Sequence, residues 1–341
     1  MTPDEFFMQR AIELAKLGIG QVSPNPRVGC VVVHNNKIIG EGWHKKFGEA
    51  HAEVNAVGSV ENKSLLNESA VYVNLEPCSH FGKTPPCADL LIKHQVKKIV
   101  ISNVDTNPLV GGNGIKKLKE AGIEIVTGVL EKQGRELNKR FFTFIERQRP
   151  YIILKWAQTA DGFIAQKNFE SKWISNEFSR TLVHQWRSEE DAVLVGTRTA
   201  SHDNPSLTVR EWSGRNPTRI VIDRFLRLNS HLHLFDKKTK TICYNVLKHE
   251  EHENLLFVRL DENNFISELL ADLYKQKIQS IIIEGGAQTL QLFIDAKLWD
   301  EARIFTSSRS FGDGIPSPAF HGTLHSSQLV QNDRLDIFSP H

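Results

Sequence analysis

The sequence predicts an α/β protein built from two domains. Its 341 residues are more than one ordinary hydrophobic core organises. Segments typical of strands alternate with segments typical of helices in both halves, which predicts a sheet covered by helices in each. The alternation breaks at Gln148-Arg149-Pro150, because a proline disfavours helix in the residue before it. We therefore expect one domain at residues 1–147 and a second at residues 148–341.

The first elements are a helix and a hairpin. Apolar residues recur at helical spacing over residues 4–18, so a helix is expected there. Strand-like runs at residues 28–33 and 38–42 flank Asn35-Asn36, whose side chains tolerate a tight turn, and this predicts an antiparallel hairpin. Between helix and hairpin, the prolines in residues 23–27 prevent this segment from joining either element. Such a stiff loop can hold a polar side chain at a pocket.

The rest of the first half predicts a sheet with helices at its strand ends. Strands are expected at residues 71–75, 97–102 and 123–127, and helices at residues 50–60, 85–93, 115–121 and 130–144. The helix at residues 50–60 has His51 and Glu53 in its first turn, where free backbone N–H groups favour anionic character. Cys78 and Cys87 also fall near a helix start, so these side chains are expected to form one compact site.

His51, Cys78 and Cys87 have the chemistry of a catalytic zinc site. One imidazole and two thiolates fill three tetrahedral positions and leave one for a water that becomes nucleophilic near neutral pH. Glu53 is placed to move protons, and the order His-x-Glu, Pro-Cys, Cys is typical of zinc deaminases. A structural zinc site or an unmetallated cluster is the alternative, but a structural site needs a fourth ligand, and no fourth Cys or His stands at close spacing.

Composition narrows the classes of partner. The chain has 42 basic and 40 acidic residues. Residues 1–146 contain 18 basic and 16 acidic residues, and the rest of the chain contains 24 of each. Neither half has the strong positive electrostatic field of a polyanion-binding protein, which argues against a nucleic-acid ligand. Four cysteines, an acidic N-terminus and the lack of a long apolar run argue against secretion and a membrane span. We expect a cytoplasmic protein.

The second half predicts a further α/β series. Strands are expected at residues 151–156, 192–195, 219–222 and 281–283, with helices at residues 177–188 and 287–294. No Gly-x-Gly-x-x-Gly motif follows a strand, but Glu284-Gly285-Gly286 joins a strand to a helix. Glycines there would let a phosphate approach the backbone and the helix N-terminus, although the same pair also fits a plain tight turn.

Several motifs occur in an order that matches one known family. The first half contains Pro24-Asn25-Pro26-Arg27-Val28-Gly29-Cys30, Asp105-Thr106-Asn107-Pro108, and eight residues between Cys78 and Cys87, where nucleic-acid deaminases usually have two. The second half contains Lys155-Trp156-Ala157-Gln158-Thr159-Ala160-Asp161-Gly162, Ser171-Lys172-Trp173, Asp203-Asn204-Pro205-Ser206-Leu207-Thr208-Val209-Arg210 and Glu284-Gly285-Gly286. Over essentially its whole length, the chain resembles the bifunctional deaminase/reductase family of riboflavin biosynthesis.

The resemblance implies two folds and two consecutive reactions. A cytidine-deaminase-like, three-layer α/β/α domain would bind Zn²⁺ through His51, Cys78 and Cys87 and use Glu53 as its catalytic proton carrier. It would deaminate 2,5-diamino-6-(5-phosphoribosylamino)pyrimidin-4(3H)-one by hydrolysis. A dihydrofolate-reductase-like α/β domain would then use NADPH to reduce the ribosyl side chain, giving 5-amino-6-(5-phosphoribitylamino)uracil.

The resemblance also assigns binding residues. The positions that match the family's cofactor contacts are Ala157, Trp173, Thr199, Asp203 and Gly286. Those that match its substrate contacts are Asn25 in the deaminase and Lys155, Ser171, Arg187, Leu207, Arg210 and Glu284 in the reductase. Arginines suit bidentate binding of a substrate phosphate, and Lys155 would protonate or polarise the sugar oxygen as hydride arrives. The ordinary alternatives are a turn residue for Asn25, surface ion pairs for Arg187 and Arg210, and core packing for Trp173.

Other residues have less specific expectations. Arg224 would reach the cofactor's 2′-phosphate or lie on the surface, and Cys30 and His44 are assigned to packing and to the surface, respectively. The helix at residues 287–294 and the strand near Arg303 are expected to form the dimer surface of a homo-oligomer, by analogy alone. His80, Lys83 and Thr84, between the two cysteines, would hold the ribose phosphate or simply be solvated.

Two rival functions remain open from the sequence. One is a zinc deaminase fold that binds or edits RNA, with the second half as an accessory domain. The charge balance and the eight-residue spacing of the cysteines argue against it. The other is an enzyme with one catalytically silent half, of which the reductase half would be the first to doubt.

Overall fold

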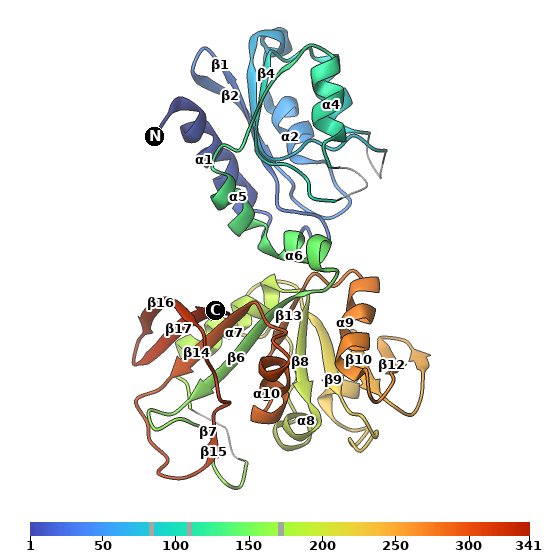
Figure 1. Cartoon of the computed structure of the whole chain (residues 1–341), viewed down its shortest axis with the longest axis vertical. Helices are drawn as coiled ribbons and strands as arrows, with labels where there is room; N and C mark the ends of the chain where they lie inside the picture. The colour runs from blue at the N-terminus through green and yellow to red at the C-terminus, as the bar shows by residue number, and fades with distance from the viewer. Residues whose placement is uncertain (82–84, 108–110, 170–173) are drawn as a thin grey trace. The chain divides into compact units, whose positions relative to one another are not determined.

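The computed structural model describes residues 1–81, 85–107, 111–169 and 174–341 (Figure 1). The chain forms two compact units, Met1–Gln148 and Arg149–His341. Each unit has its own sheet and its own buried apolar clusters. Among the described residues, no helix combines the length and the apolar character needed to cross a membrane.

The first unit is a five-stranded sheet with helices on both faces. Its strand order is β2-β1-β3-β4-β5, in which β1 is antiparallel to β2 and β3 while β3, β4 and β5 are parallel. The strands are β1 Gly29–His34, β2 Lys37–Trp43, β3 Ala70–Leu75, β4 Lys98–Asn103 and β5 Glu124–Thr127. The helices are α1 Pro3–Lys16, α2 Ala52–Ser59, the 3-10 helix η1 Lys63–Glu68, α3 Cys87–Lys93, α4 Asn113–Glu120, α5 Glu131–Leu137 and α6 Lys139–Arg147.

Burial alternates along the strands and gives the sheet two packed faces. Val31 and Val33 of β1 pack in one apolar cluster with α1, whereas Cys30 and Val32 pack in another with α2, α3 and α4. Successive side chains of a strand point to opposite faces, so both faces need a covering layer. The expected three-layer α/β/α architecture is confirmed, and so is the packing role of Cys30.

The hairpin and the start of α2 are shaped by small or permissive residues. Asn35 and Asn36 have φ of 48° and 59°, as the predicted tight turn requires. A Cβ at Gly42 would lie 2.3 Å from the backbone nitrogen of Ala56, so only glycine lets α2 pack this closely on β2. This close approach fixes α2, whose N-cap is His51, against β2.

The prediction of one closing helix over residues 130–144 is wrong. Two helices, α5 and α6, meet at Asn138, whose φ of −105° and ψ of 22° lie outside the helix region. The buried Asn138 side chain accepts a hydrogen bond from the Arg27 N–H at 2.8 Å and donates one to the Arg27 carbonyl at 2.9 Å. A contact with a loop so distant in sequence cannot be read from the local apolar pattern.

The second unit is built on a ten-stranded sheet. The strand order is β11-β12-β10-β9-β8-β13-β6-β14-β17-β16, and neighbouring strands are parallel from β12 to β14. The strands of this sheet are β6 Tyr151–Gln158, β8 Ala192–Gly196, β9 Thr218–Ile222, β10 Thr241–Asn245, β11 Glu250–His252, β12 Leu255–Arg259, β13 Ser280–Ile283, β14 Glu301–Thr306, β16 Thr323–Val330 and β17 Asp333–Ser339. Two short strands, β7 Phe163–Ala165 and β15 Ile315–Pro316, pair with each other in a separate sheet. The helices are α7 Glu177–Glu189, α8 Thr197–Asp203, the 3-10 helix η2 His233–Phe235, α9 Phe265–Lys275 and α10 Ala287–Asp295.

Helices again cover both faces of this sheet. Apolar residues of α9 and α10 pack on one face with Ile152 and Leu154 of β6, and residues of α7 and α8 pack on the other with Tyr151 and Ile153. The strands and helices expected in this half are present. The sequence analysis missed β10, β12, α8, α9 and the C-terminal hairpin β16-β17, for which no motif was recognised.

The expectation that the strand near Arg303 forms a dimer surface is wrong. That strand is β14, which lies between β6 and β17 inside the sheet, and all its residues except Thr306 are buried. The unrecognised hairpin β16-β17 is what covers it. Burial of β14 therefore depends on a pairing with residues about thirty positions later.

Candidate active sites

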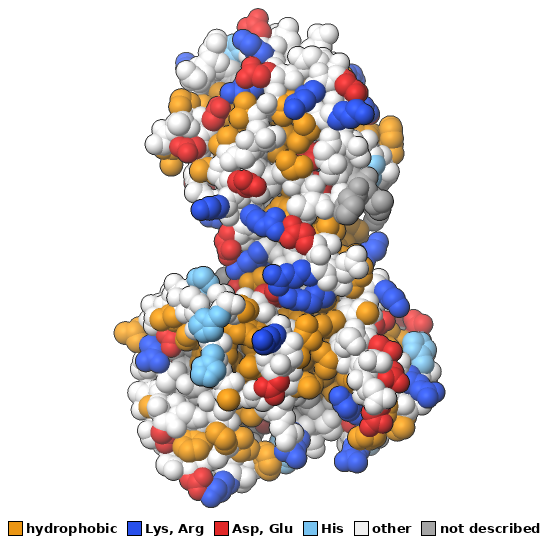
Figure 2. Space-filling view, in the orientation of Figure 1, with side chains coloured by type: hydrophobic (Ala, Val, Ile, Leu, Met, Phe, Trp, Pro, Cys, Tyr) orange, Lys and Arg blue, Asp and Glu red, His pale blue; other side chains and the backbone are white. Residues whose placement is uncertain are grey.

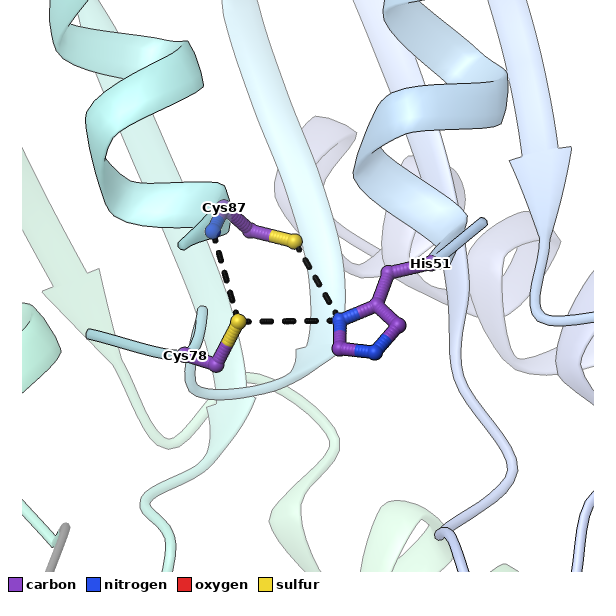
Figure 3. A group of neighbouring side chains, drawn as sticks. All are labelled: His51, Cys78 and Cys87. Carbon is purple, nitrogen blue, oxygen red and sulfur yellow. Dashed lines mark hydrogen bonds between the residues drawn. The ribbon is translucent and has the colours of Figure 1, made fainter. Parts of the chain in front are cut away.

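Three side chains from separate elements form a candidate metal site in the first unit. His51 precedes α2, Cys78 lies in the loop after β3, and Cys87 is the first residue of α3. Figure 3 shows them pointing toward one another: His51 Nδ1 lies 3.6 Å from Cys78 Sγ and 3.4 Å from Cys87 Sγ. Their possible ligand atoms all lie within 4.8 Å of one another. One nitrogen and two sulfur donors with a remaining open position fit Zn²⁺ in a catalytic site.

The two thiols shift each other's pKa in opposite directions. The hydrogen bond from Cys87 lowers the pKa of Cys78 to about 4 against the opposing effect of burial, while the hydrogen bond to Cys78 and then burial raise the pKa of Cys87. In the absence of a metal the pair therefore favours one thiolate and one thiol. Because a metal needs both as thiolates, its binding releases a proton and becomes stronger as pH rises.

Glu53 lies beside the cluster without belonging to it. It is in the first turn of α2 and only 3 % exposed. Burial, and then the neighbouring Cys78, raise the pKa of Glu53 to about 7. A carboxyl group that gains and loses a proton near neutral pH is suited to general acid–base chemistry.

Asn25 is held by His44, a residue that the sequence analysis misplaced. His44 is 3 % exposed, so its assignment to the surface is wrong. Its Nδ1 lies 3.1 Å from the Ala50 carbonyl and its Nε2 lies 3.1 Å from Asn25 Nδ2. With Nδ1–H donating, Nε2 accepts from the Asn25 amide. The His44 ring also lies edge-on to His51, with centroids 5.4 Å apart.

The local sequence around His44 gives little sign of this role. One histidine at the end of a strand is most simply read as exposed. The burial that lowers the pKa of its ring arises only from tertiary packing. Its position seven residues before His51 is the one signal that could have suggested a shared site.

The loop between the cysteines is only partly described. His80 is exposed, and Lys83 and Thr84 lie outside the described residues, as does Pro108 of the Asp105 motif. The expected phosphate-binding role of the loop therefore stays a prediction.

The second unit contains a cavity of about 1070 Å³ at the carboxyl ends of four parallel strands. These are β6, β8, β9 and β13, and ligands of α/β sheets commonly bind at such an edge. Every expected cofactor or substrate residue of the reductase that the structure describes lines this cavity, namely Lys155, Ala157, Arg187, Thr199, Asp203, Leu207, Arg210, Glu284 and Gly286. Ser171 and Trp173 lie outside the described residues.

A buried ion pair lies within this cavity. Arg187 Nε and Nη2 donate to the two carboxylate oxygens of Glu284, each at 2.7 Å. Burial would raise the pKa of Glu284, but the Arg187 guanidinium outweighs it and lowers that pKa to about 2. Arg187 is thus not a surface ion-pair partner, because its ion pair is buried, and its contact with substrate stays a prediction.

Lys155 is another charged residue that lines the cavity, close enough to the Arg187–Glu284 pair to interact with it electrostatically. It comes from β6, and burial lowers the pKa of its ammonium group although the Glu284 carboxylate opposes the shift. A lysine with a lowered pKa gives up its proton more readily than an ordinary one.

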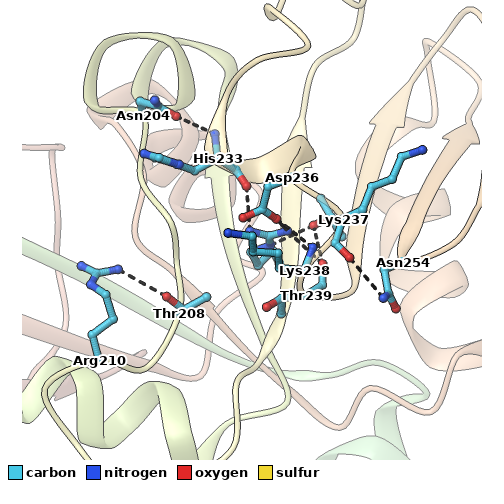
Figure 4. Close-up of polar contacts among 11 residues, drawn as sticks. Asn204, Thr208, Arg210, His233, Asp236, Lys237, Lys238, Thr239 and Asn254 are labelled. Carbon is cyan, nitrogen blue, oxygen red and sulfur yellow. Dashed lines mark hydrogen bonds and ion pairs between the residues drawn. The ribbon is translucent and has the colours of Figure 1, made fainter.

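Arg210 lies at the exposed rim of the cavity. Its guanidinium contacts the Thr208 hydroxyl at 3.4 Å (Figure 4), and its backbone N–H donates to His184 Nδ1 at 3.2 Å. The buried His184 was not recognised in the sequence. It fixes the backbone of the segment that carries both Arg210 and Leu207, whose φ is 52°.

The glycine pair forms the start of α10 at the cavity. Gly286 is the N-cap with φ of 62°, and a Cβ there would lie 3.0 Å from Thr199 Oγ1. A Cβ at Gly285 would lie 2.7 Å from Val195 Cα, so this position also excludes a side chain. The first residues of α10 line the cavity, and their backbone N–H groups suit a phosphate.

Three arginines add positive charge to the same cavity. Arg198, Arg224 and Arg227 all line it, and Arg224 also packs 4.5 Å from the centroid of the Phe265 ring. Arginine near a helix N-terminus is suited to a phosphorylated dinucleotide. The volume, the glycine-rich turn and these cations together fit NADPH.

Two family models match separate parts of the chain, one in each half. The cytidine and deoxycytidylate deaminase zinc-binding region matches residues 1–103, and the RibD C-terminal domain matches residues 150–335. The second of these alone covers more than half of the chain.

Curated relatives and solved structures agree with these matches. The riboflavin biosynthesis protein RibD of Aquifex aeolicus is 40% identical over 92% of this chain and 89% of its own length, and that of Bacillus amyloliquefaciens is 41% identical over 89% and 84%. The crystal structure of the diaminohydroxyphosphoribosylaminopyrimidine deaminase/5-amino-6-(5-phosphoribosylamino)uracil reductase of Thermotoga maritima is 37% identical, with a TM-score of 0.91 over 99% of both chains. RibD of Acinetobacter baumannii has the same TM-score and coverage at 33% identity.

Proposed function

The chain belongs to the bifunctional deaminase/reductase family of riboflavin biosynthesis, and we propose which of its residues carry each reaction. It is a zinc-dependent pyrimidine deaminase and an NADPH-dependent reductase. The observation that supports both activities in one chain is the presence of an intact His51, Cys78, Cys87 cluster with Glu53 beside it and of a charged cavity in the other unit. We assign the deaminase to residues 1–147 and the reductase to residues 148–341.

In the deaminase, His51, Cys78 and Cys87 would hold Zn²⁺ and Glu53 would carry protons. The metal, when bound, supplies a water with a pKa near neutrality. Glu53 would accept a proton from water and deliver it to the ring nitrogen of the substrate as the water oxygen bonds to the carbon that bears the amino group. It would then pass a second proton from that oxygen to the amino group, which leaves as ammonia. Its raised pKa supports this role, because the carboxyl must be both base and acid at one pH. Asn25, oriented by His44, would bind the edge of the pyrimidine.

In the reductase, Lys155 would act on the sugar oxygen. NADPH supplies the hydride that the anomeric carbon accepts. Lys155 donates or shares a proton at the ring oxygen as the sugar opens, and its lowered pKa makes it a stronger acid. The Arg187–Glu284 pair keeps one positive and one negative side chain in fixed positions in the cavity that Lys155 lines. The proposed cofactor site is bordered by Ala157, Thr199, Asp203 and Gly286. Leu207 would contact the substrate, and Ser171 and Trp173 stay predictions from the family resemblance.

Mass spectrometry of the diaminopyrimidine ribosyl phosphate tests the two reactions and their order. Incubation with zinc-loaded protein alone should add about one mass unit, because oxygen replaces NH, and NADPH should add about two more. A shift that required NADPH from the start would reverse the proposed order. The first shift alone would leave the second unit without its reaction.

Replacing Arg210 with alanine should weaken substrate binding in the reductase. A charge-assisted hydrogen bond to phosphate contributes about 1.5–3 kcal/mol, so the reductase KM should rise by about 10- to 100-fold while deamination is unchanged. Steady-state kinetics with the deaminated intermediate measure this. Arg334→Ala, which removes an exposed arginine of β17 that pairs with Asp336, is the control and should leave KM unaltered. An unchanged KM in Arg210→Ala would reject the phosphate contact.

The proposed function also predicts which partners the chain binds. Its substrate is a small molecule, and on the face shown in Figure 2 basic and acidic side chains are interspersed over both units, which supports our expectation that no nucleic acid binds. We also expect a cytoplasmic homo-oligomer that binds no membrane. Light scattering coupled to size-exclusion chromatography measures its mass, and a monomer would contradict this expectation.

A further inference from the structure

Glu76 is a buried carboxylate that directly precedes Pro77-Cys78. It is 7 % exposed and follows the last residue of β3. Its Oε2 accepts hydrogen bonds from the backbone N–H groups of Asp105 at 3.2 Å and Gly112 at 3.0 Å. Its Oε1 accepts from Gly114 at 2.9 Å and Ile115 at 3.1 Å. One side chain thus binds four backbone donors from two separate places in the chain.

These donors are the segment after β4 and the first turn of α4. The N-cap of α4 is Gly112, which has no side chain to accept the free N–H groups of the helix. Glu76 supplies the missing acceptor from another element, and its negative charge is favoured at a helix N-terminus. A Cβ at Gly114 would lie 2.1 Å from the Pro77 carbonyl oxygen, so the helix start packs directly against the peptide that leads to Cys78.

Cys78 depends on such support more than the other two ligands do. His51 and Cys87 are each fixed at a helix start, whereas Cys78 lies in a loop. On the C-terminal side, its carbonyl accepts a hydrogen bond from the Ala88 N–H at 3.1 Å and its sulfur accepts one from the Cys87 N–H at 3.3 Å, both at the start of α3. On the other side, the chain is anchored by Glu76, whose N–H also donates to the Asn103 carbonyl at 2.9 Å.

We propose that Glu76 is a positioning residue of the deaminase site, which ties Pro77-Cys78 to α4 and to Asp105 and thereby sets the place of the Cys78 sulfur relative to His51 and Cys87. The inference rests on the proposed zinc-binding role of these three residues. A carboxylate is required because two oxygens must face four donors. In a glutamine one oxygen becomes an NH₂ group, which would point at two backbone N–H groups.

The test is Glu76→Gln in the full-length, zinc-loaded protein. Groups that orient metal ligands commonly contribute 10- to 100-fold in metal affinity or activity. We expect release of zinc to excess chelator to accelerate by about tenfold and deamination kcat/KM to fall by about tenfold or more. The cobalt-substituted protein should show an altered cobalt–thiolate absorption spectrum. Reduction of the deaminated intermediate should be unchanged.

Asp4→Asn is the matched control for a loss of stability alone. Asp4 accepts hydrogen bonds from the Tyr72 hydroxyl at 2.7 Å and from Lys98 Nζ at 3.0 Å, and it belongs to α1, which packs on the sheet face opposite to α2 and α3. This variant should lower the thermal stability of the same unit while keeping the zinc release rate and the cobalt spectrum of the wild type.

Two results would overturn the proposal. One is a folded Glu76→Gln protein with wild-type zinc release and a wild-type cobalt spectrum, and the other is an Asp4→Asn protein that reproduces the changes at equal loss of stability. If Glu76→Gln does not fold, Glu76→Asp, whose shorter carboxylate cannot reach all four donors, is judged by the same measurements. A wild-type protein that binds zinc without deaminating would instead contradict the proposed function.

Discussion

Replacing Glu53 with glutamine will lower the deamination rate by about 10³-fold while NADPH-dependent reduction of the deaminated intermediate continues. The amide has the shape of the carboxyl group but cannot carry a proton from water to the substrate. Because Glu53 is almost fully buried, the neutral amide introduces no new buried charge, and the protein should fold. Ammonia release measures the first reaction and NADPH absorbance the second.

The zinc content of the Glu53 variant separates proton transfer from metal binding. It should equal that of the wild type, since Glu53 is assigned no ligand role. Glu61→Gln, at an exposed glutamate just beyond α2, is the control and should deaminate normally. Wild-type deamination in Glu53→Gln would remove Glu53 from the mechanism, and the loss of both activities together would contradict independent sites.

Replacing Glu284 with glutamine will destabilise the second unit and impair reduction. Arg187 would keep a buried positive charge without its bidentate partner, and Lys155 would lose a carboxylate that favours its charged form. Breaking a buried pair in this way costs about 3–5 kcal/mol. We expect that loss in the free energy of unfolding and a fall of about tenfold or more in the kcat/KM of reduction.

The pH dependence of stability follows from the same ion pair. The folded pKa of Glu284 is about 2, below its usual 4.5, so the carboxylate contributes stability that is fully present above pH 4.5 and is lost as pH falls toward 2. The difference in unfolding free energy between wild type and Glu284→Gln should therefore shrink over this range. Five of the six tryptophans follow residue 149, so tryptophan fluorescence in urea reports mainly on this unit.

Asp300→Asn is the matched control for Glu284→Gln. The Arg149–Asp300 pair is also bidentate, its side chains are 11% and 7% exposed against 11% and 8% for Arg187 and Glu284, and neither residue lines the cavity. It should cost similar stability and leave reduction kinetics unchanged in the folded protein. Equal losses of reduction in both variants would show that Glu284 acts through stability alone.

The local sequence predicted most of the fold. Asn35-Asn36 predicted the turn between β1 and β2, and the helical spacing after Asp4 predicted α1, because both depend on the conformational preferences of consecutive residues. It failed at residues 130–144, where the pattern is continuous but Asn138 bonds to Arg27. It failed again at β14, whose burial depends on the hairpin that follows it.

In the candidate sites, too, some residues could be recognised from the local sequence and others only from tertiary contacts. His51, Cys78 and Cys87 could be recognised from residue type and spacing, since few side chains suit zinc and fewer have a glutamate two residues on. The residues that position the side chains of this site could not. His44 gives no sign of its contact with Asn25, and Glu76 resembles any glutamate at a strand end until α4 docks on it.

Residue types and spacings alone predicted two α/β halves, a zinc ligand set of one histidine and two cysteines, and a glutamate as the proton carrier, and the family motifs predicted two reactions. The tertiary structure decided which partners those groups have. In the folded protein Arg187 forms an ion pair with Glu284, the described reductase residues line one cavity, and Glu76 links the segment before Cys78 to α4. The reason is physical, because reactivity and local conformation belong to neighbouring residues, whereas buried hydrogen bonds and ion pairs form only when distant segments exclude water together.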